Sequence, residues 1–291
     1  MKTELRALID LLEDPDPQVF QSLKTLILAY GTQAIEDLEN AGRKAVSEEH
    51  LYRIEYLISE LLFRDIRHRM RDWIISGGTD IHEGYKLVAE LIHSDSRHYT
   101  YKNLFSEIRN EAWLELNNKL TALEKTMVVN HFFYDKYQLQ IDTKNPALPA
   151  RYSLSRLASD KLGNEESLLA AYTVVARGLD LPIFGVQIPG LSLLAYLDLP
   201  FIPRPGFDPS NTPILFFIHP GEKGRIFGIE EVRFFLSKFY PDLVSQEVRA
   251  CTDTILLRNY IRSLAKSCMK AGKNELESKL FDLLNLWKAK Q

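Results

Sequence analysis

One segment in the middle of the chain, residues 165–219, constrains the fold more than any other. Its first part has an apolar helical pattern formed by Leu168, Leu169, Tyr172 and Val175. Three short runs rich in β-branched and aromatic residues follow, IFGVQI, LSLLAYL and ILFFIH, and a proline-rich loop separates the last two. The segment therefore predicts a buried helix followed by three short strands, in a domain that combines helix with sheet.

The first third of the chain has a helical pattern. Leu5, Ile9 and Leu12 fall on one helix face, and Asp16 stands where it can cap a second helix. Two short helices joined by Asp-Pro resemble a HEAT-type repeat, although only one good copy is present and a solenoid needs about three or more. We expect residues 1–95 to form a small HEAT-like helical domain.

The last third predicts a pair of amphipathic helices on either side of the sequence AGKN, within residues 241–291. Such a pair packs on the neighbouring domain or presents a groove to a partner helix or peptide. Cys251 and Cys268 lie in this region without a nearby catalytic partner, and two cysteines make no disulfide framework. We interpret both as small buried apolar residues in a reduced compartment.

Composition excludes several classes of protein. A net charge of -3 gives no overall attraction to nucleic acid or to an anionic membrane. The start of the chain, MKTELRALID, carries charges within its apolar pattern, so it predicts an amphipathic helix and no signal peptide. No run approaches the roughly 20 uncharged residues of a membrane span. We expect a cytoplasmic protein.

Clusters of basic and histidine residues predict no binding site. The basic residues of FRDIRHRMRDW alternate with Asp65 and Asp72 at spacings that allow pairing along a solvated helix face. His82, His93 and His98 lack the spacing of metal ligands. We therefore expect no metal and no cofactor.

Three motifs in the central region resemble a known family. GNEESL (163–168) opens the core helix, RGLDLPIFGVQIPGLS (177–192) follows it, and IHPGEKG (218–224) comes later. Their order and spacing resemble the transglutaminase-like superfamily, specifically its SirB-type bacterial branch, and ILLRNYIRSLAKSCMKAGK (255–273) resembles the tetratricopeptide-like tail of that branch. The resemblance covers about residues 105–285. It implies a papain-related α+β domain over 96–240, with a small antiparallel sheet against a core helix and helical regions on both sides.

The resemblance also implies where a catalytic site would lie. Active members use a cysteine at the start of the core helix, a histidine on the next strand and an aspartate on the strand after it. At or next to these positions this chain has Glu165, Leu191 and His219. We therefore expect no catalytic residue and a degenerate cleft. Its candidate positions are Gly163, Asn164, Glu165, Glu166, Ser167, Pro189, Gly190, Leu191 and His219.

Each candidate also has a structural interpretation that needs no ligand. Glu165 and Glu166 are favourable at the positive end of their helix, by about 0.3–1 kcal/mol each. Ser167 suits a capping role, His219 suits a turn, and the Gly163–Asn164 pair allows a tight turn into the helix.

Three functions remain open. The first is a non-catalytic module that binds a protein or peptide partner or acts in regulation, with no nucleic acid or membrane contact. The second is a hydrolase or amidase with altered machinery, using Glu165 or Glu166 with His219. The third is a small-ligand binder that uses the residual cleft.

Overall fold

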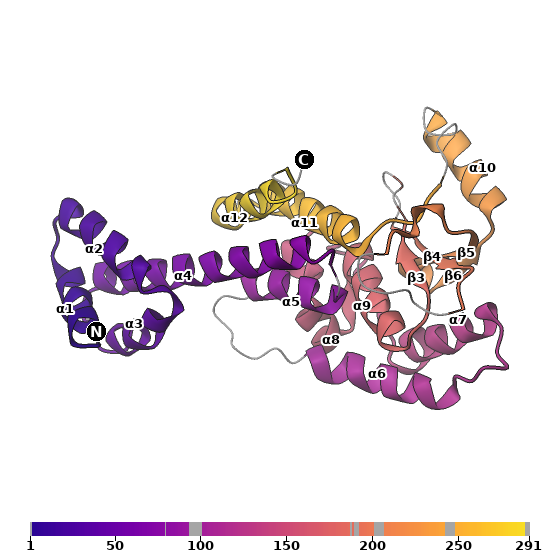
Figure 1. The fold of residues 1–291 in the computed structure, drawn as a ribbon, viewed down its shortest axis with the longest axis horizontal. Coiled ribbons are helices and arrows are strands. Elements are labelled where there is room, and N and C mark those ends of the chain that lie inside the picture. Colours follow the sequence, from indigo (N-terminus) through magenta and orange to yellow (C-terminus); the bar gives the residue numbers. More distant parts are fainter. Residues whose placement is uncertain are drawn as a thin grey trace. The chain divides into compact units, whose positions relative to one another are not determined.

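The computed structural model describes residues 2–78, 80–92, 101–186, 188, 192–200, 207–241 and 248–288. Its packing separates two compact units, one of Met1–Arg71 and one that comprises Asp72–Ile92 and Ser96–Gln291. Figure 1 colours both along the sequence, from indigo at the N-terminus to yellow at the C-terminus. None of the described helices is long and apolar enough to cross a membrane.

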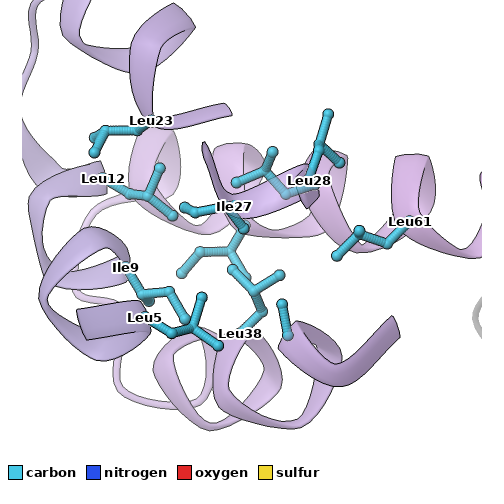
Figure 2. Close-up of a cluster of buried hydrophobic side chains, with 11 residues drawn as sticks. Leu5, Ile9, Leu12, Leu23, Ile27, Leu28, Leu38 and Leu61 are labelled. Carbon is cyan, nitrogen blue, oxygen red and sulfur yellow. The ribbon is translucent and has the colours of Figure 1, made fainter. Parts of the chain in front are cut away.

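The first unit is a small helical bundle. Apolar side chains from all its helices form one core, in which Leu5, Ile9 and Leu12 are buried as predicted (Figure 2). Asp16 caps the second helix by accepting a hydrogen bond from the Gln18 amide at 2.7 Å, which confirms the predicted helix start. The elements are α1 (Lys2–Asp10), η1 (Leu11–Glu13), α2 (Pro17–Ala29), η2 (Gly31–Ala34), α3 (Ile35–Gly42) and α4 (Glu48–Ile75), whose last turn is grouped with the second unit.

Arg53, on α4, holds the turn between the first two helices. Its buried guanidinium donates hydrogen bonds to the carbonyl oxygens of Leu12 (3.2 Å), Asp14 and Pro15 (3.3 Å). It also pairs with Glu49 at 2.6 Å. These carbonyls lie at the end of η1 and in the turn after it, so one arginine satisfies acceptors that the local backbone leaves open.

We expect Arg53→Met to destabilise this unit by about 2 kcal/mol, because it removes several bonds from one charged donor. Hydrogen exchange of the α1 and α2 amides would measure the loss. Arg6→Met is the matched control, since Arg6 is 67% exposed in its pair with Asp37, and exposed pairs contribute about 0–1 kcal/mol. Equal effects of the two changes would contradict the assigned role of Arg53.

The basic segment of α4 behaves as the sequence predicts. Arg69 pairs with Asp65 at 2.9 Å, one helical turn away. Among the histidines considered as ligands, His93 and His98 lie outside the described residues. Within the described ranges, no group of three His, Cys, Asp or Glu residues is arranged to hold a metal ion.

The second unit contains a four-stranded antiparallel sheet in the order β3-β4-β5-β6 and a separate pair of short parallel strands, β1 and β2. The three predicted strands are confirmed as β3, β4 and β5. The strands are β1 (Gln140–Ile141), β2 (Leu162–Gly163), β3 (Ile183–Gly185), β4 (Leu194–Leu197), β5 (Ile214–His219) and β6 (Arg225–Phe227).

Helices make up most of the rest of this unit. The described helices of the unit are α5 (Ile81–Ile92), α6 (Tyr101–Glu115), α7 (Ala122–Asn130), the π-helix η3 (His131–Lys136), η4 (Pro149–Tyr152), α8 (Leu154–Asp160), α9 (Glu165–Gly178), η5 (Pro209–Asn211), η6 (Pro220–Glu222), α10 (Ile229–Phe239), α11 (Asp253–Lys270) and α12 (Asn274–Asn285). Most described residues are helical, so the predicted α+β class with a predominantly helical content is confirmed.

Helix α9 is the core helix of the unit. Leu168, Leu169, Tyr172 and Val175 are buried, as predicted. The helix packs against β3, against the turn after β5, and against α5, α6 and α8 (Figure 1). A helix enclosed on so many sides is apolar on most of its faces, and α9 carries charged side chains only in its first and last turns.

Helices α11 and α12 form the predicted C-terminal pair and pack side by side. Gly272 joins them with φ +68°, a left-handed position that favours glycine. Helix α11 also packs on α5, η4 and β3. The domain limits near residues 95 and 240 stay predictions, while α5 is grouped by its packing with the second unit.

The π-helix η3 is more deeply buried than α7, the helix before it. Phe132, Phe133 and Tyr134 of η3 are buried, but Met127 is 59% exposed. Helix α7 buries only the face that carries Thr126 and Val129, and Met127 projects from it into solvent.

Candidate functional site

The start of α9 is closed by hydrogen bonds between its own residues. The Asn164 side chain accepts a bond from the Ser167 amide at 2.9 Å, and the Ser167 hydroxyl accepts one from the Asn164 amide at 2.9 Å. The same hydroxyl donates to the Asn164 carbonyl oxygen at 3.0 Å, and Ser167 is fully buried. Ser167 therefore caps the helix, and its oxygen is engaged within the cap.

Gly163 precedes this cap because a larger residue does not fit. A Cβ atom at Gly163 would lie 2.2 Å from the Ser167 oxygen. The left-handed position of this turn is Lys161, with φ 61°, two residues earlier. Close packing is thus the reason for this glycine, and neither Gly163 nor Asn164 supplies a positive φ.

A cavity of about 750 Å³ opens beside the first turn of α9. Asn164, Glu165 and Glu166 line it, whereas Gly163, Ser167 and His219 do not. Pro189, Gly190 and Leu191 lie outside the described residues. The remaining lining residues are Ile141, Pro146, Ala147, Tyr152, Leu169, Val186, Ile188, Ser192, Leu256, Asn259, Arg262, Ser263 and Lys266.

Glu166 is the most enclosed charged group of this cavity. The hydroxyls of Ser263 and Ser192 donate to the same carboxylate oxygen, at 3.3 and 3.5 Å. Burial raises the pKa of Glu166 above its ordinary value, the nearby charge of Glu165 adds to the rise, and the serine hydrogen bonds oppose it. The side chain therefore joins the beginning of α9 to the face of α11.

Glu165 lies on the other side of the same turn, toward His219. The Cγ of Glu165 and the Cε1 of His219 lie 3.0 and 3.1 Å from the position that a Cβ on Gly221 would take. In the part of the chain that the structure describes, no hydrogen bond or ion pair joins the two side chains. His219 is buried at the end of β5, and its Nδ1 has no hydrogen-bond partner among the described residues.

Three side chains hold the turn that follows His219. The Tyr134 hydroxyl donates to the Pro220 carbonyl oxygen at 2.9 Å, and the Asn130 amide donates to the Gly224 carbonyl oxygen at 2.8 Å. The Tyr172 hydroxyl donates to the Asn130 side-chain oxygen at 3.0 Å. The turn is therefore fixed to both η3 and the core helix.

The opposite wall of the cavity comes from α11, which the sequence did not connect with the cleft. Asn259, Arg262, Ser263 and Lys266 are spaced along one helix face and line the cavity together. The polar spacing was visible in the sequence. A polar helix face normally meets solvent, however, so nothing local distinguished this face from an ordinary one.

Neither cysteine lines this cavity, and both are buried. Burial raises the pKa of the Cys251 thiol to about 12, and it also raises the pKa of Cys268. A thiol acts as a nucleophile only as its thiolate, so burial and a raised pKa both disfavour reaction of these side chains in the folded protein.

We expect both native thiols to react slowly with a thiol reagent such as Ellman's reagent at pH 8, and rapidly once the chain is unfolded. Glu165→Cys is the matched comparison, because it places a thiol in the exposed first turn of α9, where the helix end stabilises a thiolate. This new thiol should react at least about tenfold faster than the native pair. Rapid reaction of a native cysteine in the folded protein would contradict the assigned burial.

The comparisons with known proteins agree with this architecture. Searches of the curated proteins and of the solved structures each found no significant match. In a scan against protein-family models, the model described as transglutaminase-like superfamily matches residues 99–259. This is more than half of the chain, and it includes the sheet, the core helix and the cavity lining as far as Asn259. The chain therefore belongs to the transglutaminase-like superfamily.

Proposed function

We propose that this protein is a non-catalytic member of the transglutaminase-like superfamily that acts as a protein-interaction or regulatory module. One observation carries the proposal: the first turn of the core helix presents two carboxylates, Glu165 and Glu166, where the resemblance implies a cysteine. Carboxylates at this point are stabilised by the helix end and need no catalytic partner.

Two further features support the proposal. The serine of this turn, Ser167, is engaged in the helix cap and is buried. Both cysteines are buried elsewhere, with raised pKa values. Among its own residues, the first turn of α9 therefore presents no thiol and no free hydroxyl as a nucleophile. The hydroxyls of Ser192 and Ser263 that face this turn are engaged as donors to Glu166.

We also propose the finer assignments that the resemblance implies. The protein would belong to the SirB-type branch, with a HEAT-like helical region before the family domain and a tetratricopeptide-like pair after it, and it would act in the cytoplasm. Helical regions of these types commonly bind proteins, an argument by analogy that assigns the partner class and no specific partner.

A second candidate function is an altered hydrolase that uses Glu165 with His219. The observation in its favour is that both side chains flank Gly221. A general base needs a hydrogen-bonding distance of about 2.6–3.2 Å to the proton it moves, either directly or through one water. Glu165 lines the cavity and His219 does not, so a substrate in the cavity would meet only one of the pair.

An activity assay with variants separates the two candidates. The purified full chain is incubated with a glutamine-containing peptide and with a p-nitrophenyl ester, and release of ammonia or of nitrophenol is followed. We expect rates equal to the protein-free background for the native chain, for Glu165→Gln and for His219→Ala.

Turnover by the native chain that falls in both variants would overturn the proposal and favour the altered hydrolase. Turnover that survives both substitutions but disappears on thiol alkylation of the folded protein would equally overturn it, by assigning the chemistry to a cysteine.

A further inference from the structure

We propose that the cavity beside the core helix binds a short peptide with apolar side chains and both ends charged. Its ammonium group would lie against Glu165 and Glu166, and its carboxylate against Arg262 and Lys266. This inference rests on the proposed non-catalytic function and deepens it, since it assigns the site and chemical class of a bound molecule.

The first observation is that opposite charges line one cavity without neutralising each other. Glu165 and Glu166 contribute carboxylates from α9, and Arg262 and Lys266 contribute cations from α11. Among the described residues, Arg262 hydrogen-bonds only to Asn259, at 3.3 Å, and Lys266 makes no ion pair. Glu166 is bonded by two serine hydroxyls and by no base.

These charges are therefore available to a ligand that carries both signs. A single anion would meet the repulsion of two carboxylates, and a single cation would meet that of the two basic side chains. An amphoteric molecule that spans the cavity satisfies both walls. Electrostatic complementarity of this kind selects one ligand charge pattern over others.

The second observation is the apolar lining between the charged walls. Leu169, Val186, Ile188 and Leu256 are buried and line the cavity, as does Tyr152. Apolar walls with a few polar groups are the usual composition of a small-molecule site. A ligand with apolar side chains between its two charged ends would bury those side chains here.

The third observation concerns size and hydrogen bonding. The cavity volume of about 750 Å³ falls within the range of about 300–1,000 Å³ that ligand sites occupy, and it exceeds what one amino acid needs. Ser192 and Asn259 add a hydroxyl and an amide to the lining. Such groups can donate to and accept from peptide bonds. A dipeptide or tripeptide is thus the ligand class that matches charge, polarity and size together.

Isothermal titration of the full chain with leucyl-leucine tests the proposal. Two further probes differ from it by one charge each: N-acetyl-leucyl-leucine lacks the ammonium group, and leucyl-leucine amide lacks the carboxylate. We expect saturable binding of the unmodified dipeptide and binding at least about tenfold weaker for each capped form.

Matched variants locate the site. Two variants should each bind the dipeptide about tenfold more weakly or worse than the native chain. They are Glu166→Gln and the double variant Arg262→Gln with Lys266→Gln. Lys270→Gln is the control on the same helix, because Lys270 is exposed and does not line the cavity. This variant should bind the dipeptide with the affinity of the native chain. Arg262 and Lys266 are exposed side chains, so their removal leaves the packing of α11 intact.

Absence of saturable binding up to about 10 mM dipeptide, well above a millimolar Kd, would overturn the proposal. Equal affinity for the capped peptides would also overturn it, because recognition would then depend on the apolar side chains alone. Mass spectrometry of the same samples keeps the two proposals distinct. Cleavage of the dipeptide would overturn the non-catalytic function. Binding without cleavage, with equal affinity for the free and capped peptides, would overturn only the peptide-binding proposal.

Discussion

Gly224→Ala is expected to destabilise the second unit by about 3 kcal/mol. Gly224 has φ +70°, a conformation that costs an L-residue about 1–2 kcal/mol. A Cβ atom there would also lie 2.0 Å from the side-chain oxygen of Asn130. Asn130 would have to move, and it holds both the Gly224 carbonyl oxygen and the Tyr172 hydroxyl. Leaving such partly buried groups unpaired adds about 1–3 kcal/mol.

Gly272→Ala is the matched control for this change. Gly272 has nearly the same backbone angle, φ +68°, but nothing lies within 4 Å of a Cβ built on it. Gly272→Ala should therefore lower the free energy of unfolding only by the backbone strain, about 1–2 kcal/mol. All three tryptophans, Trp73, Trp113 and Trp287, belong to the second unit, so their fluorescence in a urea titration reports on the unit that contains both glycines. Equal losses for the two variants would refute the contact with Asn130.

Asp253→Asn should cost a comparable amount, about 3 kcal/mol, by leaving a buried arginine without its counter-charge. Asp253 begins α11 and accepts a hydrogen bond from Arg177, near the end of α9, at 2.8 Å; the two side chains are 13% and 15% exposed. The guanidinium of Arg177 also lies 3.6 Å from the centre of the Phe184 ring. Burial raises the pKa of Asp253, and the Arg177 charge opposes that rise.

A double variant shows whether the loss of stability comes from an unpaired buried charge. The double variant Arg177→Met with Asp253→Asn removes both charges, and it should recover at least about half of the loss because no unpaired ion remains. Glu230→Gln is the control for exposed pairs, since Glu230 and Arg233 are 80% and 61% exposed, and it should cost less than about 1 kcal/mol. Additive losses in the double variant would show that the Arg177–Asp253 pair is not the source of the effect.

Local features of this fold were predictable from the sequence because they depend on neighbouring residues. The cap at Asp16 and the buried face of α9 are examples, since a helix start or an apolar stripe is written in consecutive residues. The strands β3, β4 and β5 are also continuous apolar runs. The short β6 was missed, because its three residues are too few to show a pattern between the turn at Gly224 and α10.

The candidate site was only partly predictable, because sequence patterns report on neighbouring residues and the two walls of the cavity are far apart in the chain. Asn164, Glu165 and Glu166 follow from the position of the core helix, and they do line the cavity. The facing residues Arg262 and Lys266 are about 100 positions away, and an amphipathic helix shows which face is polar but not what that face meets.

The sequence by itself determined the start of α2, the apolar face of α9, the strands β3, β4 and β5, and the resemblance to the family to which the chain belongs. Tertiary structure alone decided that a cavity remains beside α9, that α11 supplies its second wall, and that Gly224 must be a glycine because of Asn130. The physical reason is the distance along the chain between the groups that interact. Caps, stripes and turns are set by interactions within a few residues, whereas cavity walls, buried ion pairs and close backbone contacts join segments that only the packed chain brings together.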